Sequence, residues 1–126
     1  MILGIGIDMT EIERIEKACE RQAFFLRIYT PAEQELYGGN IPSLAARFAV
    51  KEAVVKAFGT GFRGIQPSEI ETVSDELGKP VVKLYGEARK RFGEMGCKQI
   101  HVSITHTKTT AAAMVVLEGE RACADC

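Results

Sequence analysis

The sequence predicts an α+β domain in which an antiparallel sheet packs against a long central helix. Two observations favour this class. A helix-forming, mostly apolar run fills residues 42–58, and the second half of the chain consists mostly of alternating, strand-like segments. The length of 126 residues and the apolar fraction of 46% suit one domain with a real core. We therefore expect a single domain over residues 1–117 and a polar tail over residues 118–126.

The first expected strand spans residues 2–8 and places Gly4 and Gly6 on the same face. Two glycines on one strand face indicate that another element approaches closely there. The amphipathic helix that follows is expected to begin at Thr10, because Glu13 stands three residues later and completes a capping-box pattern.

Two further helices are expected before the chain turns to strands. Thr30-Pro31-Ala32-Glu33 combines an N-cap, a first-position proline and a capping glutamate, and opens a short helix that ends at Gly38-Gly39. The long central helix opens at Pro42-Ser43 and ends near Phe58-Gly59. The remaining elements are expected to be a hairpin of strands 69–74 and 80–85, a helix over 87–95, and strands over 99–105 and 110–117.

Charge and composition restrict the function classes. The formal net charge is −1, so nothing global indicates a nucleic acid or an anionic membrane as partner. No apolar run reaches the ~20 residues of a membrane span, and the N-terminus lacks the basic start of a signal peptide, so we expect a cytoplasmic protein. The four cysteines fit reduced thiols, since the CxxC of Cys123 and Cys126 has no second half of a zinc site.

Four charged residues interrupt the apolar central helix. At about 100° per residue, Arg47 and Lys51 lie on one side, whereas Glu52 and Lys56 lie together on nearly the opposite side. A helix that is apolar almost all round is usually buried, and a carboxylate in such a place needs a partner, a metal or a function. Glu52 is therefore the first candidate functional residue.

Asp8, at the end of the first strand, is the second candidate. Two carboxylates together with substrate phosphates commonly hold Mg²⁺, so Asp8 and Glu52 predict a magnesium site beside a phosphate-bearing ligand. Lys56 adds a compact positive charge for the same ligand. Simpler interpretations remain open: Asp8 can stabilise a helix N-terminus, Lys56 can pair with Glu52 at i,i+4, and Arg47 can be a solvated helix charge.

The alternating residues His101, Ser103 and Thr105 form a polar strand face. This face is either a row of donors for a nucleotide sugar or phosphate, or the solvent side of an edge strand. The glycine-rich loop of residues 59–64 is not a Walker A loop, because it lacks the G-K-[ST] ending. No nucleophile-elbow motif supports a Ser-His-Asp triad.

Four motifs follow one another along the chain: GIGIDMTEIERI at residues 4–15, RFAVKEAVVKAFGTG at 47–61, GKP at 78–80 and HVSITHT at 101–107. In this order and spacing they resemble the bacterial holo-[acyl-carrier-protein] synthase family. The resemblance implies transfer of 4′-phosphopantetheine from coenzyme A to a serine of an apo acyl carrier protein, with release of adenosine 3′,5′-bisphosphate. It also implies Mg²⁺ dependence and a homotrimer with active sites between protomers.

The resemblance implies roles for residues at the matching positions. Asp8 and Glu52 would hold Mg²⁺ against the coenzyme A pyrophosphate, and Lys56 would contact a phosphate oxygen. Either carboxylate could orient the water that takes the serine proton. Contacts to the nucleotide and pantetheine portions are implied for Arg47, Gly78, Lys79, Pro80, His101 and Thr105.

The acyl carrier partner is acidic, so a local basic face is needed that the net charge hides. Arg14 lies within the first motif and is the best candidate for carrier recognition. Arg21 and Arg27 are expected to help, with Phe24 as an apolar anchor. Such charge pairs mainly set the encounter rate and the register.

Two other functions are alternatives to this one. Glycine-rich strands that end in aspartate also occur in actin-like kinases and chaperones, but this chain is too short for that two-lobed fold and lacks a second phosphate loop. The other alternative is a non-enzymatic trimer that binds acidic partners. Such a binder would not require Glu52 and Lys56 to be buried together beside Asp8.

Overall fold

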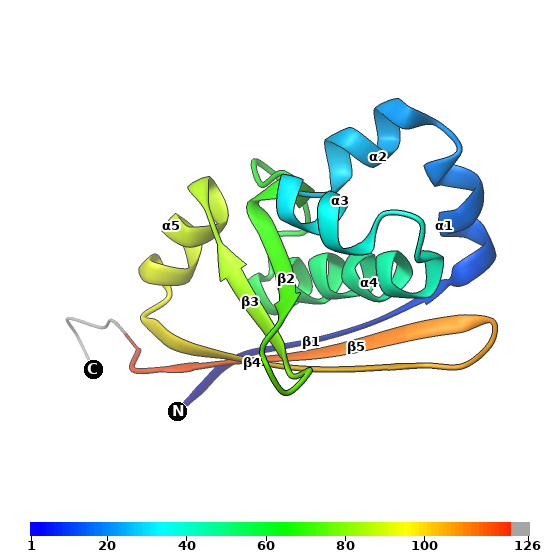
Figure 1. Ribbon diagram of the computed structural model, residues 1–126. Helices are drawn as coiled ribbons and strands as arrows, with labels where there is room; N and C mark the ends of the chain where they lie inside the picture. The colour runs from blue at the N-terminus through cyan, green and yellow to red at the C-terminus, as the bar shows by residue number, and fades with distance from the viewer. Residues whose placement is uncertain (122–126) are drawn as a thin grey trace.

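The computed structural model describes residues 1–121 and has an α+β architecture (Figure 1). A three-stranded antiparallel sheet has the strand order β1-β5-β4, and a separate two-stranded antiparallel hairpin is formed by β2 and β3. The elements in chain order are β1 (Ile2–Glu11), α1 (Ile12–Cys19), α2 (Gln22–Ile28), α3 (Pro31–Tyr37), α4 (Ile41–Phe58), the 3₁₀ turn η1 (Pro67–Glu69), β2 (Ile70–Ser74), β3 (Pro80–Leu84), α5 (Gly86–Glu94), β4 (Cys97–His106) and β5 (Thr110–Gly119).

Helix α4 lies along one face of the three-stranded sheet, between it and the layer formed by the other helices and the β2–β3 hairpin (Figure 1). The two glycines of β1 explain the close contact. A Cβ atom on Gly4 would overlap the carbonyl oxygen of Ala57, and one on Gly6 would overlap that of Ala53. The predicted close approach to this strand face is confirmed, and the approaching element is the central helix.

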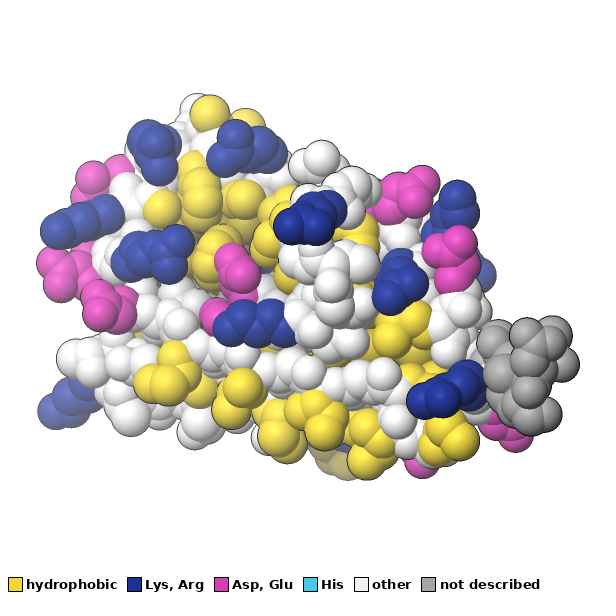
Figure 2. All heavy atoms as spheres, turned by 180° about the vertical axis from the view of Figure 1, so that it is seen from behind, with side chains coloured by type: hydrophobic (Ala, Val, Ile, Leu, Met, Phe, Trp, Pro, Cys, Tyr) yellow, Lys and Arg dark blue, Asp and Glu magenta, His cyan; other side chains and the backbone are white. Residues whose placement is uncertain are grey.

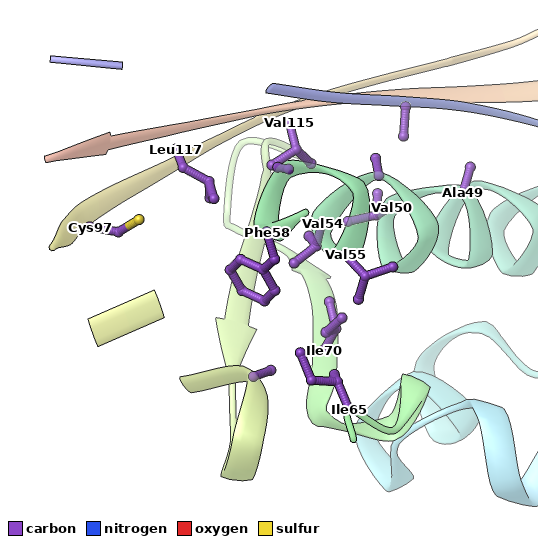
Figure 3. Packing of buried hydrophobic residues seen from close by; sticks show 14 residues of the cluster. Ala49, Val50, Val54, Val55, Phe58, Ile65, Ile70, Cys97, Val115 and Leu117 are labelled. Atoms are coloured by element: carbon purple, nitrogen blue, oxygen red, sulfur yellow. The ribbon is translucent and has the colours of Figure 1, made fainter. Parts of the chain in front are cut away.

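The core lies between α4 and the sheet and continues towards the hairpin (Figure 3). Val54 and Phe58 of α4 are almost fully buried, as are Val115 and Leu117 on the facing side of β5. A second apolar cluster packs α1 and α2 against the first half of α4. The long helix is therefore buried on most of its circumference, as its composition predicts.

Several predicted boundaries are confirmed. Thr30 and Glu33 form the capping box of α3, with Glu33 N–H donating to Thr30 Oγ1 at 3.2 Å and Thr30 N–H to Glu33 Oε1 at 2.9 Å. Helix α3 ends at Gly38, and α4 ends at Gly59, which has a φ of 76°. The hairpin, the helix over residues 86–94 and the last two strands lie where expected, to within a few residues.

Two expectations need correction, and one helix was missed. Thr10 does not cap α1: it is a buried residue of β1, which pairs with β5 as far as Glu11, and its hydroxyl donates to Asp8 Oδ2 at 3.1 Å. Helix α2 was not predicted. Strand β5 continues to Gly119, so residues 118 and 119 belong to the sheet and not to a tail. Cys123 and Cys126 lie outside the described residues.

Candidate active site

Strand β1 and helix α4 bring the first two candidate residues together. The Nζ atom of Lys56 lies 3.0 Å from Oδ1 of Asp8 and also donates to the carbonyl oxygen of Ile7 at 3.0 Å. Lys56 thus pairs with Asp8, and its side chain is 52% exposed whereas that of Asp8 is 15% exposed. The other oxygen of the Asp8 carboxylate accepts from Thr10. The Asp8 side chain is therefore held in place where β1 meets the last turn of α4.

Glu52 lies beside this pair, half-buried on α4. Burial raises the pKa of its carboxyl group above the ordinary value, and the negative charge of Asp8 raises it further, whereas Lys56 and Arg14 oppose the shift. Two carboxylates that repel each other next to a lysine form a site with unbalanced negative charge. Within residues 1–121, no group of three or more His, Cys, Asp or Glu side chains is arranged to hold a metal ion.

The deeply buried charges of α4 are not the ones expected. Arg47 is 6% exposed and Lys51 is fully buried, whereas Glu52 is half-buried and Lys56 is exposed. The expectation that Glu52 and Lys56 are buried together is therefore wrong, although both lie beside Asp8. The solvated-charge interpretation of Arg47 is wrong as well, because β2 and α3 cover the guanidinium on the opposite side of the helix.

Arg47 lines a concavity of about 240 Å³ next to the β2–β3 turn. The predicted residues Gly78 and Pro80 line the same concavity, with Ser74 and His106, which the sequence analysis did not single out. Gly78 has a φ of 84°, which suits its place in the tight turn. Lys79 lies in the same turn but does not line the concavity.

Arg47 has no carboxylate partner within ion-pair distance in the described part of the chain. Its nitrogens donate to three neutral oxygens: Thr72 O at 3.3 Å, Ser43 O at 3.4 Å and Ser74 Oγ at 3.3 Å. Its positive charge is therefore not neutralised by the protein. A buried cation of this kind fits an anionic ligand.

His101 and Thr105 are not brought to Asp8 within one chain. The β4 residues that face α4 are Ile100, Val102 and Ile104, so His101 and Thr105 point to the outer face of the sheet. There the His101 ring nitrogen Nε2 lies 2.8 Å from Glu118 Oε1. The expected alternation of β4 is confirmed, but a single protomer does not assemble these two residues with the carboxylates.

A basic groove of about 400 Å³ lies over α1 and the start of α2. Arg14, Arg21 and Phe24 line it together, and Lys17 adds a further positive charge. The floor includes Phe48, whose ring lies 5.7 Å from the Arg14 guanidinium carbon. Figure 2 shows lysine and arginine side chains gathered around a hollow lined with hydrophobic side chains on this face. Arg27, at the end of α2, does not line the groove.

Comparisons with known proteins identify the family. The family model described as 4′-phosphopantetheinyl transferase superfamily matches residues 4–115. A holo-[acyl-carrier-protein] synthase of Lachnoclostridium phytofermentans is 56% identical over 118 residues, which cover 94% of this chain and 97% of the relative. The chain belongs to the 4′-phosphopantetheinyl transferase superfamily, in the group of holo-[acyl-carrier-protein] synthases.

Solved structures show the same fold. The crystal structure of a holo-(acyl-carrier-protein) synthase from Bacillus anthracis in complex with CoA (3′,5′-ADP) has a TM-score of 0.80 and 38% identity, covering 95% of this chain and 99% of that one. The Helicobacter pylori holo-[acyl-carrier-protein] synthase in complex with coenzyme A also has a TM-score of 0.80, with 31% identity. The match covers 90% of this chain and 99% of that one. Across residues 1–121, no helix is both long and apolar enough to cross a bilayer.

Proposed function

We propose that this chain transfers 4′-phosphopantetheine from coenzyme A to a serine of apo acyl carrier protein, leaving adenosine 3′,5′-bisphosphate. The observation that carries the proposal is the cluster of Asp8, Glu52 and Lys56 beside the basic groove. Because the nucleophile belongs to the carrier protein, the site needs only to bind the diphosphate, balance its charge and accept a proton.

The two carboxylates suit Mg²⁺, which prefers oxygen ligands and is commonly held by one or two carboxylates plus substrate phosphates. Asp8 and Glu52 would hold the ion, which supplies charge neutralisation for the diphosphate when it is bound. Burial is the main cause of the raised pKa of Glu52, and repulsion from Asp8 adds to it. A divalent cation would relieve that repulsion. Lys56 would move its ammonium group from Asp8 to a phosphate oxygen, and one carboxylate would orient the water that takes the serine proton.

The concavity at Arg47 is proposed to receive another anionic part of coenzyme A. The buried guanidinium lacks a counter-charge among the described residues, and the neighbouring turn exposes backbone at Gly78 and Pro80. Lys79, exposed in the same turn, would supply a further positive charge.

The basic groove is proposed as the docking surface for the acidic carrier protein. Arg14 contributes both to the groove and to the electrostatic field at Glu52, so a carrier in the groove lies next to the carboxylates. Phe24 and Phe48, with ring centroids 6.3 Å apart, offer an apolar patch between the charges. Arg27 would act only at longer range.

A homotrimer is proposed because the outer face of the sheet is unusually apolar for a surface that faces solvent. Ile5, Ile7 and Met9 of β1 are 61%, 62% and 69% exposed, and Met114 of β5 is 45% exposed. Figure 2 shows hydrophobic side chains in a row along the sheet side of the molecule. His101 and Thr105 also point to this face, so a neighbouring protomer is what would bring them to a site between subunits.

The proposal is tested by incubating apo acyl carrier protein with coenzyme A and Mg²⁺ and measuring the intact mass of the carrier. The expected result is a gain of one phosphopantetheine that stops when Mg²⁺ is chelated. Asp8→Ala and Glu52→Ala should fold and give no gain. If the wild-type protein binds carrier proteins but modifies none, the non-enzymatic binder is the better description.

A further inference from the structure

We propose that helix α3 is a positioning element for Arg47, and that Glu33 and Tyr37 fix the guanidinium through the free edge of strand β2. The inference rests on the proposed role of Arg47 as a contact for an anionic part of coenzyme A. It concerns two residues, Glu33 and Tyr37, that lie neither at the Asp8–Glu52 site nor in the basic groove.

The two α3 residues act on β2 in the same way. Among residues 1–121, strand β2 pairs only with β3, so its other edge offers backbone groups to side chains. Thr72 N–H donates to Glu33 Oε2 at 2.9 Å, and Ser74 N–H donates to the Tyr37 hydroxyl at 3.1 Å. Glu33 and Tyr37 are four residues apart and therefore lie on one face of α3.

The same two β2 residues hold the guanidinium. Arg47 Nε donates to the carbonyl oxygen of Thr72, and an Arg47 terminal nitrogen donates to Ser74 Oγ. Tyr37 also contacts the guanidinium directly, with 3.6 Å between the guanidinium carbon and the ring centroid. Burial by itself would raise the pKa of Tyr37, but the bonds from Ser74 and the charge of Arg47 outweigh it and lower that pKa. Both β2 anchors of Arg47, Thr72 and Ser74, are thus held in turn by α3.

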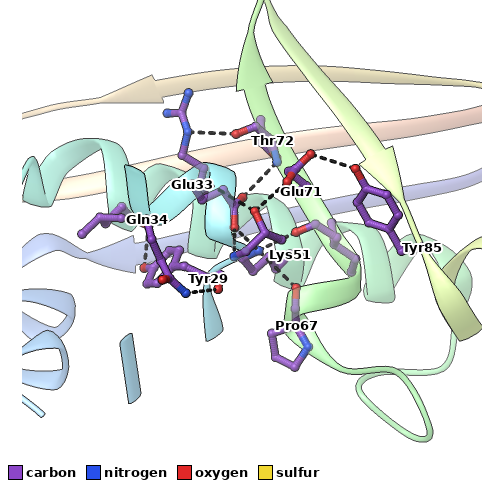
Figure 4. A network of polar contacts seen from close by, with 12 residues as sticks. Tyr29, Glu33, Gln34, Lys51, Pro67, Glu71, Thr72 and Tyr85 are labelled. Carbon is purple, nitrogen blue, oxygen red and sulfur yellow. Dashed lines mark hydrogen bonds and ion pairs between the residues drawn. The ribbon is translucent and has the colours of Figure 1, made fainter. Parts of the chain in front are cut away.

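A buried ion pair keeps α3 in place (Figure 4). Lys51 Nζ lies 2.7 Å from Glu33 Oε1 and also donates to the carbonyl oxygens of Pro67 and Ile70. Both Lys51 and Glu33 are 0% exposed. The Glu33 carboxylate also accepts the backbone N–H groups of Thr30, the N-cap of α3, and of Thr72 on β2. A network in which the buried carboxylate and ammonium groups are both hydrogen-bonded fixes one arrangement of its members.

The arrangement leaves the charge of Arg47 available. A carboxylate placed directly on the guanidinium would orient it equally well but would also neutralise it. Here the negative charge of Glu33 lies beyond Thr72, whose N–H donates to Glu33 and whose carbonyl oxygen accepts from Arg47. The contacts to Arg47 itself are neutral oxygens and a ring. The guanidinium is therefore oriented without losing its attraction for an anion.

The test is a double-mutant cycle in the carrier-modification assay, with kcat and the KM values for coenzyme A and carrier protein measured separately. Tyr37→Leu and Glu33→Gln are each made alone and together with Arg47→Gln. Tyr29→Phe is the matched control, because it removes a buried tyrosine hydroxyl that donates to Leu44 O, at 2.8 Å, away from Arg47. Thermal melts and circular dichroism establish which variants fold.

Each α3 substitution should raise the KM for coenzyme A by about tenfold, the scale of one hydrogen bond to a charged group. The values of kcat and of the carrier KM should change by less than about twofold, as expected when the ground state and the transition state lose the same binding energy for coenzyme A. In the Arg47→Gln background the α3 substitutions should change the coenzyme A KM by less than about twofold, because residues acting through one group are not additive. Tyr29→Phe should leave all three parameters near the wild-type values.

The inference is overturned if a folded Tyr37→Leu protein keeps the wild-type KM for coenzyme A, or if its effect is equally large with and without Arg47. It is also overturned if Arg47→Gln leaves that KM unchanged. Should Glu33→Gln not fold, the Tyr37→Leu cycle decides alone. All these outcomes require a wild-type protein that modifies its carrier, and absence of that activity would instead refute the proposed function.

Discussion

The ammonium group of Lys56 lies 3.0 Å from Oδ1 of Asp8, joining the last turn of α4 to strand β1. Because the lysine is half exposed, such a pair is worth only about 0–1 kcal/mol of stability. Its importance lies in where it places a positive charge: next to two carboxylates, where the diphosphate of coenzyme A is proposed to bind.

Lys56→Gln should therefore impair transfer far more than folding. We expect kcat to fall by about 100-fold, the scale of losing one electrostatic stabiliser of the transition state, with a small change in the unfolding midpoint. Lys90→Gln, at an exposed position on α5, is the charge-matched control and should change neither kcat nor the unfolding midpoint. Parallel losses of activity and stability in the Lys56 variant would argue for a structural role.

Glu52→Gln should stabilise the metal-free protein at neutral pH. Because the pKa of Glu52 is raised in the folded state, the native protein binds more protons than the unfolded chain between the ordinary value of 4.5 and the raised value. The unfolding free energy therefore decreases as pH rises through this window. Above the raised pKa, the destabilisation caused by ionising Glu52 in the folded protein has reached its full size. A glutamine has no such cost.

Thermal melts from pH 4 to pH 8 without divalent ions check this directly. The melting temperature of Glu52→Gln should exceed that of the wild type at the upper end of the range and approach it at the lower end. Added Mg²⁺ should raise the wild-type value alone. Glu35→Gln, at an exposed site on α3, is the control. Equal melting temperatures of wild type and Glu52→Gln at neutral pH would contradict a cost of ionising Glu52 through its burial and its repulsion from Asp8.

Gly6→Ala should destabilise the fold and separate the site residues. The new methyl group would overlap the carbonyl oxygen of Ala53, so β1 must move away from α4 at a cost of about 2 kcal/mol or more. Gly93→Ala is the matched control, since its Cβ meets nothing within 4 Å in helix α5, where alanine is favoured. Urea denaturation should show opposite shifts for the two variants. A neutral effect of Gly6→Ala would mean that the strand and helix are not in close contact.

Charge reversal in the basic groove should weaken carrier binding specifically. Arg14→Glu and Arg21→Glu should each raise the KM for carrier protein by about tenfold at low salt, with a smaller effect at high ionic strength. The KM for coenzyme A should not change. Arg27→Glu should have a weaker effect, because Arg27 does not line the groove. An equal effect of all three reversals would place the carrier on the wider helical surface instead.

The outer sheet face offers a test of assembly. Ile7→Asp places a charge in the exposed apolar row on β1 and should convert a trimer to monomers in light-scattering measurements. Activity should be lost with the trimer if His101 serves a neighbouring site. Ile2→Asp, at the beginning of the same strand, is a milder comparison. A wild-type protein that is monomeric at micromolar concentration while active would contradict this part of the account.

Much of the fold could be predicted because its signals are local. The capping box of Thr30 and Glu33 and the paired glycines Gly4 and Gly6 each specify a contact within a few residues or on one strand face. The Thr10 capping signal failed because pairing with Ala111 of β5 extends the strand past it. Tertiary hydrogen bonds outweighed the local preference there.

The site was only partly predictable for the same reason. Asp8, Glu52 and Lys56 lie together as their motifs indicated, but the burial of Lys51 depends on Glu33, 18 residues away in sequence, and on carbonyl groups of a later segment. Helical periodicity cannot reveal such partners. Likewise, alternation placed His101 and Thr105 on the same face of β4, but it could not show that this face is turned away from the carboxylates.

The most direct test is anomalous diffraction from crystals grown with coenzyme A and Mn²⁺ in place of Mg²⁺. We predict one strong anomalous peak per active site, coordinated by carboxylate oxygens of both Asp8 and Glu52 and by phosphate oxygens of the ligand. Coenzyme A bound in crystals of active protein with no metal peak between these two residues, or with the metal held elsewhere, would contradict the account.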